Sequence, residues 1–350
     1  MSIDRYHRQA LLPQIGRAGQ ERLRKASVLL VGCGALGSVI AEQLVRAGIG
    51  RLRLADRDIV ELTNLQRQVL FDEEDVREQT PKAIATERRL RRVNSEVEID
   101  ARVTDVHAGN VEELAGCDGP GRPVDLILDG TDNVDTRNLL NDAAVKHGIP
   151  WIYGACVGTE GRCMAILPPS GPCLRCVFSD PPAAAELPTC DTAGVLAPAA
   201  AVVASLQVTA ALRVLLGQAK PQSESLISMD VWRGRFHSIP LIDAKRADCP
   251  TCGRRAFAYL DCSQSGRSTS LCGRNAVQIR SAKDEAVDLS RMAAKLSQIG
   301  RVQQTPYLLR CALHDPREIQ LTVFPDGRAI IQGTADFERA RSIYARFVGS

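Results

Sequence analysis

The tract VLLVGCGALGSVIAEQLVRAGIGRLRLADRD, residues 28–58, constrains the fold of this 350-residue chain more than any other segment. It begins with a short apolar run typical of a strand and continues with the pattern G-x-G-x-x-G, formed by Gly32, Gly34 and Gly37. Apolar residues then recur at helical spacing over residues 38–47. A strand, a glycine turn and a helix in this order place nucleotide phosphates over the helix N-terminus, where free backbone N–H groups and the helix dipole favour anions.

A second strand is predicted over residues 51–55, and it ends at Asp56. A carboxylate about twenty residues beyond such glycines commonly accepts the hydroxyl groups of a ribose. The tract therefore predicts a nucleotide-binding domain, but it does not choose between ATP and NAD.

The following residues continue the alternation of strand-like and helical segments. Strands are predicted over residues 28–31, 51–55, 96–102, 126–129, 151–156 and 163–167. Such alternation favours an α/β fold with a Rossmann-like, doubly wound and mostly parallel sheet, in which antiparallel strands come late in the order.

The last third of the chain differs in character. An Ala-rich apolar stretch over residues 195–216 is predicted to be a buried helix that starts near Pro198, and two strands follow within residues 225–239. The polar run 261–270 is predicted to be a linker. Residues 271–350 are predicted to form a small α+β domain, with strands over 276–280, 306–313, 319–324 and 329–332 and helices over 287–299 and 336–348.

Composition excludes several classes of function. The net charge of +3, the 4% aromatic content and the absence of a basic stripe argue against a nucleic-acid partner. The polar first 27 residues lack a secretory apolar core, and the stretch at 195–216 carries Gln207 and Arg213, so neither secretion nor a membrane span is expected. A cytoplasmic location follows, and there twelve cysteines indicate metal ligation or thiol chemistry rather than disulfides.

Two C-x-x-C pairs are candidate metal knuckles. Cys173 and Cys176 form one pair, and Cys249 and Cys252 form the other; each pair lies beside Pro or Gly. Four thiolates saturate a tetrahedral Zn²⁺, which makes the site structural. The alternatives are four ordinary core cysteines, or a redox dithiol at one of the pairs.

Acidic residues cluster around the strand predicted at 126–129. Asp125, Asp129, Asp132 and Asn133 occur here, and carboxylates at the C-terminal end of a parallel strand face the ligand crevice. An acid pair at this place suits Mg²⁺ bound to a triphosphate. The structural alternative is an Asp that caps the helix starting at Val134.

Other candidate residues are individually ambiguous. Asn64, Arg67 and Gln68 follow Asp56 and Asp58, and Lys82 comes later; such cations clamp phosphates, although solvated surface residues look the same. Arg8 lies in a charged N-terminal arm. Cys190 follows a Pro-rich loop and precedes the apolar helix, a context that suits either a nucleophilic thiol or a buried structural cysteine.

Together, and in this order, the motifs RYHRQ, GCGALG, LADRDIVELTNLQRQ, TPKA, DGTDN, the two C-x-x-C pairs and TCDTAGVLAP resemble the E1-like adenylyltransferases of the MoeB/ThiF type. These are bacterial relatives of ubiquitin-activating enzymes, and the resemblance covers roughly residues 4–255. It implies ATP rather than NAD, and a reaction that adenylates the C-terminal Gly-Gly of a small ubiquitin-like sulfur-carrier protein and releases pyrophosphate. It also implies that residues 1–260 are the adenylation domain, with an arm at 1–25, a nucleotide-binding core at 26–167 and a zinc- and carrier-binding part at 168–260.

The resemblance also implies roles for single residues. Asp56 and Asp58 belong to the nucleotide-binding set with Gly32, Gly34, Ala35, Gly37, Gln68 and Asn133, in which Asp56 holds the ribose and the backbone at Gly34 and Ala35 approaches the phosphates. Asn64, Arg67 and Lys82 hold the triphosphate, Asp132 places Mg²⁺, and the four paired cysteines hold structural zinc. Arg8 matches an arginine that reaches into the partner subunit's site, which implies a homodimer, and Cys190 matches a cysteine that some members use in sulfur or carrier transfer.

Two features depart from the family pattern. Ala35 stands where many members have glycine, so a negative φ is expected there. Residues 271–350 are not a rhodanese domain, because no cysteine lies in a rhodanese-like loop; Cys272 and Cys311 lie in or beside predicted strands. No chemistry is assigned to this C-terminal domain. The competing interpretations are a non-catalytic nucleotide-binding module of the same fold and an NAD-dependent oxidoreductase; the carrier, its pathway and a cysteine desulfurase or sulfurtransferase partner stay open.

Overall fold

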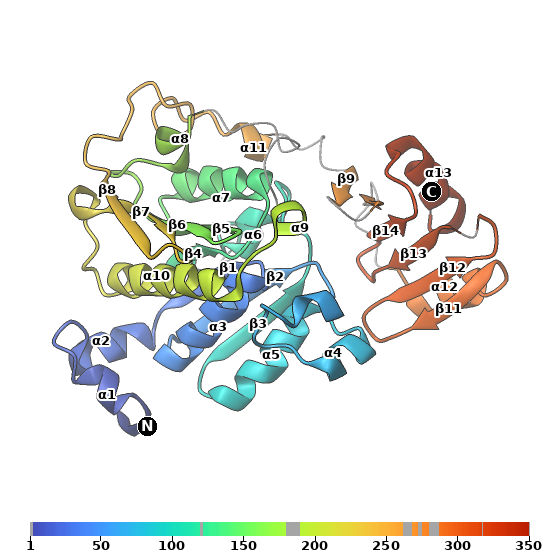
Figure 1. Cartoon of the computed structure of the whole chain (residues 1–350), viewed down its shortest axis with the longest axis horizontal. Coiled ribbons are helices and arrows are strands. Elements are labelled where there is room, and N and C mark those ends of the chain that lie inside the picture. The colour runs from blue at the N-terminus through green and yellow to red at the C-terminus, as the bar shows by residue number, and fades with distance from the viewer. Residues whose placement is uncertain are drawn as a thin grey trace. The chain divides into compact units, whose positions relative to one another are not determined.

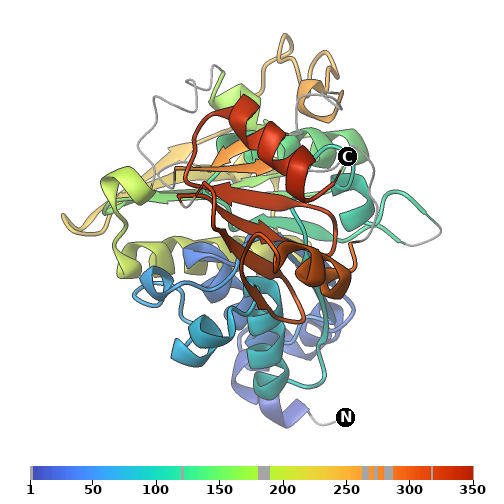
Figure 2. The same cartoon turned by 90° about the vertical axis from the view of Figure 1, so that its right-hand side faces the viewer.

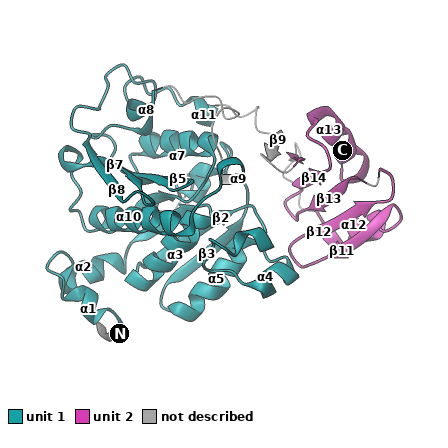
Figure 3. Ribbon diagram, viewed as in Figure 1, with its two compact units in different colours: residues 1–261 teal, residues 262–350 magenta. Residues whose placement is uncertain are grey.

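The computed structural model describes residues 3–119, 122–179, 190–261, 268–271, 275–279, 287–316 and 318–349. The chain divides into two compact units, residues 1–261 and residues 262–350 (Figure 3). The first unit contains two hydrophobic clusters, one on each side of its sheet, and the second unit has a cluster of its own.

An eight-stranded mixed sheet with the order β3-β2-β1-β4-β5-β6-β7-β8 forms the centre of the first unit. Its strands are β1 (Ser27–Val31), β2 (Arg51–Asp56), β3 (Glu98–Val103), β4 (Leu126–Asp129), β5 (Trp151–Val157), β6 (Glu160–Ile166), β7 (Ser225–Asp230) and β8 (Arg235–Pro240). The strands from β3 to β5 pair in parallel, whereas β6, β7 and β8 pair antiparallel. The predicted doubly wound sheet with late antiparallel strands is confirmed.

Helices cover both faces of this sheet (Figures 1 and 2). The helices α3 (Ala35–Ala47), α5 (Lys82–Val93) and α10 (Ala197–Leu215) pack on one face, and α6 (Val111–Leu114), α7 (Val134–His147), α8 (Leu174–Val177) and α11 (Ala258–Asp261) lie on the other. The remaining elements of the unit are η1 (Ile3–Tyr6), α1 (His7–Ala10), α2 (Gly16–Leu23), η2 (Leu62–Asn64), α4 (Glu73–Glu78), α9 (Cys190–Ala193) and η4 (Pro221–Ser223). Strands buried on both faces explain why β1 and β4 read as continuous apolar runs.

The helix α10 is the one described helix that is long and apolar enough to cross a membrane by length and composition. It packs against α3, β5 and β6, and the amide of its buried Gln207 donates to the Asp129 carbonyl at 2.7 Å. It is therefore a partly buried core helix, as the sequence predicted.

A six-stranded antiparallel sheet with the order β11-β12-β13-β14-β10-β9 forms the second unit. Its strands are β9 (Ser268–Leu271), β10 (Ala276–Ile279), β11 (Gly300–Gln304), β12 (Leu309–Leu313), β13 (Gln320–Val323) and β14 (Ala329–Gln332), and its helices are α12 (Leu289–Leu296) and α13 (Phe337–Phe347). The predicted small α+β fold is confirmed, but both edge strands differ from the predictions. β9 starts within the predicted linker, and β11 lies between the predicted helix 287–299 and the predicted strand 306–313. Both are too polar to show the alternation of a half-buried strand.

Candidate nucleotide site and metal centre

The glycine turn connects β1 to α3 and brings three parallel strands together. The Gly130 amide donates to the Val31 carbonyl at 2.7 Å, and the Gly32 amide donates to the Ala55 carbonyl at 2.8 Å. Gly32 has a φ of +89°, and a Cβ there would lie 2.7 Å from the Gly130 carbonyl oxygen. The position therefore needs glycine for both its backbone conformation and the close approach of β4.

The other two glycines of the motif have different surroundings. A Cβ on Gly37 would lie 1.9 Å from the Gly32 carbonyl oxygen, so α3 starts in direct contact with the turn. A Cβ on Gly34 would meet nothing nearer than 3.9 Å, and that atom is the amide nitrogen of Gln68. A Cβ at Gly34 would therefore make only ordinary van der Waals contacts. The first residues of α3 carry free backbone N–H groups, which favour an anion. Ala35 is the first residue of α3 and is not among the described residues with positive φ, as predicted.

Asp56 lies at the end of β2 and is tied to the same turn. One carboxylate oxygen accepts from the Cys33 amide at 2.6 Å, and the other accepts from the Asp58 amide at 2.7 Å. Burial raises the pKa of Asp56, and the nearby Lys82 ammonium opposes that rise. The structure thus places Asp56 at the predicted place, where it also shapes the glycine turn.

Lys82 begins α5 and lies buried beside Asp58. Its ammonium group is 3.0 Å from the Asp58 carboxylate, and its backbone amide donates to the Asp58 carbonyl at 2.9 Å. A buried ammonium that is paired with a partly exposed carboxylate can exchange that partner for a phosphate without leaving the buried ammonium unpaired, since water can solvate the released carboxylate.

The predicted polar cluster divides into two groups. Asn64 is buried and accepts from the Glu61 amide at 3.1 Å, which caps the short helix η2, while Arg67 donates to the Thr63 carbonyl at 2.8 Å. Gln68 is 4% exposed, and its side-chain oxygen has no hydrogen-bond partner among the described residues. Gln68 is also the member of the cluster that lies beside Gly34, with its amide nitrogen 3.9 Å from a Cβ built there.

The turn after β4 separates the predicted acid pair. Asp129 is fully buried and forms an ion pair at 2.9 Å with Arg137, whereas the magnesium role of the predicted pair stays a prediction. Asp132 is exposed. Asn133, rather than an Asp, caps α7 by accepting from the Thr136 amide at 3.0 Å.

Arg8 does not lie at the glycine turn of its own chain. The neighbouring Gln9 donates to the Ala47 carbonyl at 2.9 Å, which places this arm at the C-terminal end of α3. Because α3 has 13 residues, its two ends are about 20 Å apart. Cys190 is the first residue of α9, but its side chain, like the loop at residues 181–189, lies outside the described residues.

The two C-x-x-C pairs meet and form one cluster of four thiols. All four sulfur atoms lie within 4.8 Å of one another, with Cys173 3.5 Å from Cys249 and Cys176 3.3 Å from Cys252. Zn–S bonds of about 2.3 Å in a tetrahedron place sulfur atoms about 3.8 Å apart. The cluster therefore fits a structural zinc ion that is saturated by protein ligands.

Two neighbouring residues of α7 hold the two knuckles. The Asn141 side chain accepts from the Leu174 amide at 2.9 Å, next to the first pair. The buried Asp142 carboxylate accepts from the Thr251 hydroxyl at 3.1 Å and from the Tyr259 amide at 2.9 Å. Thr251 comes just before Cys252 in the chain, and Tyr259 comes after it. Burial raises the pKa of Asp142 to about 6.

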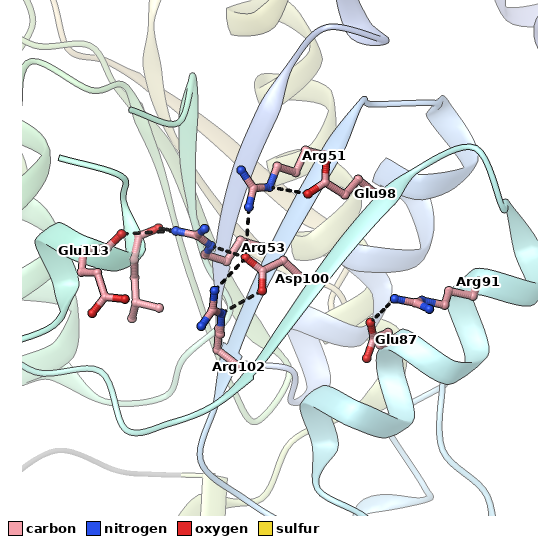
Figure 4. A network of polar contacts seen from close by, with 9 residues as sticks. Arg51, Arg53, Glu87, Arg91, Glu98, Asp100, Arg102 and Glu113 are labelled. Atoms are coloured by element: carbon pink, nitrogen blue, oxygen red, sulfur yellow. Dashed lines mark hydrogen bonds and ion pairs between the residues drawn. The ribbon is translucent and has the colours of Figure 1, made fainter. Parts of the chain in front are cut away.

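A separate polar network joins the outer strands β2 and β3 and the helix α6 (Figure 4). Asp100 accepts from Arg53 at 2.8 Å, from Arg51 at 3.2 Å and from Arg102 at 2.7 Å, and Arg53 also donates to the Leu114 carbonyl at 2.8 Å. Against the effect of burial, the hydrogen bonds from Arg102 and Arg53 lower the pKa of Asp100. These arginines hold the strands and α6 together, and none of them is a predicted site residue.

Comparison with known sequences and structures gives consistent matches. The chain matches the ThiF family over residues 6–251. The sulfur carrier protein ThiS adenylyltransferase of Bacillus subtilis is 44% identical over 347 residues, which are 99% of each chain. The sulfur carrier protein adenylyltransferase of Thermus thermophilus is 41% identical over 256 residues, covering 72% of this chain and 91% of the relative. A crystal structure of E. coli MccB with ATP has a TM-score of 0.60 at 23% identity, over 71% of this chain and 74% of that one, and this likeness shows the fold alone.

Proposed function

The chain belongs to the ThiF family of E1-like adenylyltransferases, and we propose that it adenylates the C-terminal carboxylate of a ThiS-like sulfur carrier with ATP. The observation that carries this conclusion is the 44% identity to a ThiS adenylyltransferase over 99% of both chains. That match includes nearly all of the second unit, so the two proteins share the whole architecture and not only the nucleotide-binding domain.

We expect ATP to bind beside the glycine turn. The phosphates would approach the backbone at Gly34 and Ala35, where the side-chain amide nitrogen of Gln68, 3.9 Å from a Cβ built on Gly34, would donate to a phosphate oxygen. Asp56 would receive the ribose hydroxyls, and Asn64 and Arg67 would line the triphosphate. Lys82 would pair with a phosphate in place of Asp58, because both are anionic oxygen ligands for the same ammonium.

Asp132 is the carboxylate that suits Mg²⁺. It is exposed and is not needed to cap α7, since Asn133 performs that role. Mg²⁺ prefers hard oxygen ligands and keeps several waters, so a single carboxylate together with phosphate oxygens is sufficient. When bound, the ion supplies positive charge to the triphosphate.

In the reaction, a carboxylate oxygen of the carrier bonds to the α-phosphorus, and the bond to the bridging oxygen of pyrophosphate breaks. No general base is needed, because the carboxylate is already ionised near neutral pH. Arg67 and Lys82 would stabilise the charge that develops on the α-phosphate and the pyrophosphate. We propose that Arg8 of the partner subunit adds to this charge in a homodimer, which agrees with the distance of Arg8 from its own glycine turn.

The remaining predictions concern partners and environment. The zinc ion would join the loop after β6 to the segment before α11 and would take no part in the reaction. A cytoplasmic location fits a cluster of thiolate ligands, because a reducing compartment keeps thiols available. Sulfur transfer through Cys190, closure of residues 181–189 over the intermediate, and a cysteine desulfurase or sulfurtransferase partner also stay predictions.

The test is ATP–pyrophosphate exchange by the purified protein, with thiamine-type and molybdopterin-type carriers added separately. We expect exchange that depends on the thiamine-type carrier and disappears when its terminal glycine is removed. Asp132→Ala is expected to abolish exchange while leaving the fold intact, since an exposed residue can be replaced with little loss of stability; retained exchange would contradict the Mg²⁺ role. Tight ATP binding without exchange for either carrier would favour the non-catalytic alternative, and absence of ATP binding would refute the proposal.

A further inference from the structure

Arg137 is a largely buried cation that the proposed chemistry does not use. It lies on the first turns of α7, and its side chain is 13% exposed. Its guanidinium donates to the Asp129 carboxylate at 2.9 Å, to the Thr131 carbonyl at 2.6 Å and to the Gly154 carbonyl at 3.2 Å. It also lies over the Tyr153 ring, at 5.6 Å from the ring centroid. One side chain thus joins the end of β4 and the middle of β5 to α7.

The segment held in this way is the turn that leads to Asp132. The second oxygen of Asp129 accepts from the Thr131 amide at 2.9 Å and from the Thr131 hydroxyl at 2.7 Å. The Asp129 carbonyl accepts from Gln207 at 2.7 Å. Arg137 binds both the carboxylate that starts the turn and the Thr131 carbonyl within it, so it fixes the path of the backbone up to the residue before Asp132.

Stability alone does not account for such a pair. Replacing a buried ion pair by apolar side chains of similar size is often neutral or stabilising, because the desolvation of both charges offsets their attraction. What a guanidinium provides and an apolar group cannot is a planar fork that fixes several acceptors at once. The acceptors here belong to the end of β4, to the turn that precedes Asp132 and to the middle of β5.

We propose that Arg137 is a positioning residue for adenylyl transfer, and that it holds the Asp129–Asp132 turn so that the Asp132 carboxylate meets the metal-bound triphosphate. The inference rests on the proposed function, because it takes Asp132 to be the metal ligand. Arg137 itself does not touch the nucleotide, so its loss acts through the geometry of Asp132.

The experiment measures ATP binding at equilibrium, without any carrier, in Mg²⁺ and in EDTA, together with the Mg²⁺ dependence of exchange. For Arg137→Met we expect at least about a tenfold rise in the Mg²⁺ concentration that gives half-maximal exchange, since one good charge-assisted contact is worth about that factor. ATP binding in EDTA is expected to stay unchanged. Arg137→Lys keeps the charge but not the fork, so we expect an intermediate Mg²⁺ requirement; this variant decides the question if Arg137→Met does not fold.

Arg53→Met is the matched control. Arg53 is 14% exposed, is paired with Asp100 at 2.8 Å and donates to backbone carbonyls, as Arg137 does, but it lies in the outer network of Figure 4. We expect it to lower thermal stability without changing the Mg²⁺ requirement. If Arg137→Met loses stability but keeps the wild-type Mg²⁺ requirement, as the control does, the inference about Arg137 is wrong. In that case exchange by the wild-type protein still supports the proposed function. A wild-type protein that does not bind ATP in Mg²⁺ overturns both.

Discussion

Replacement of Gly37 by alanine, compared with replacement of Gly34, tests whether the two glycines have the separate roles that the structure gives them. A Cβ on Gly37 would lie 1.9 Å from the Gly32 carbonyl oxygen, and ordinary contact starts at 3.4 Å. The start of α3 would therefore have to withdraw by about 1.5 Å, against the close packing of the core. At Gly34 the nearest atom is 3.9 Å away, so the added methyl group fits without displacing any protein atom.

The expected magnitudes follow from this difference. Overpacking against a rigid neighbour costs about 1–3 kcal/mol, and the neighbour here is backbone, so we expect Gly37→Ala to cost about 3 kcal/mol. For a unit of this size that corresponds to a fall in Tm of roughly 6–12 °C. Gly34→Ala is expected to keep the wild-type Tm and to weaken ATP binding by about tenfold or more, because the methyl group occupies the space left for a phosphate.

Thermal unfolding followed by circular dichroism and ATP binding followed by calorimetry measure the two effects on the same samples. The reasoning requires the variants to separate, with the larger loss of Tm in Gly37→Ala and a loss of ATP affinity at unchanged Tm in Gly34→Ala. Equal losses of Tm would refute the assigned packing role of Gly37. Wild-type ATP affinity in Gly34→Ala would show that the phosphates do not lie beside Gly34.

Three further predictions concern the metal centre, a buried acid and the dimer. Elemental analysis of the purified protein is expected to find about one zinc ion per chain. The Cys249→Ser variant is expected to lose both the zinc ion and thermal stability. A metal-free wild type whose four thiols react freely would contradict a zinc site. Burial raises the pKa of Asp142 to about 6 from an ordinary 3.8, so the folded state binds this proton more tightly than the unfolded chain does. Wild type should therefore gain stability relative to Asp142→Asn as the pH falls from 7 to 5 in urea unfolding, and a constant difference would exclude the effect. If Arg8 acts in the partner's site, mixing inactive Arg8→Ala and Asp132→Ala dimers should restore about a quarter of wild-type exchange through mixed dimers, and no recovery after subunit exchange would argue against a shared site.

The sequence predicted those parts of the molecule that depend on neighbouring residues. The strand, glycine turn and helix around Gly32 were predictable because their order, their spacing and the restrictions on backbone conformation are local. Each C-x-x-C pair likewise fixes its own geometry within one turn. That the two pairs meet across the fold was inferred from the chemistry of zinc, and the structure bears it out.

The sequence could not decide between residues of one motif that look alike. Asp129 and Asp132 are both acids after the same strand, yet Arg137 pairs with the first and leaves the second exposed. That choice depends on where α7 packs, which is a property of the tertiary structure. The edge strands β9 and β11 were missed for a related reason, because strand pairing there depends on a neighbouring strand rather than on an apolar pattern of their own.

The helix α7 connects the two candidate sites. Asn133, Arg137 and Asn141 are spaced four residues apart, so they lie along one side of the helix. The first caps the helix beside Asp132, the second fixes the turn before Asp132, and the third holds the first cysteine pair. These contacts hold α7 at its N-terminus and at its middle, which restricts any shift of its first turns. We therefore expect the four-cysteine cluster to help fix the helix whose N-terminus lies beside Asp132.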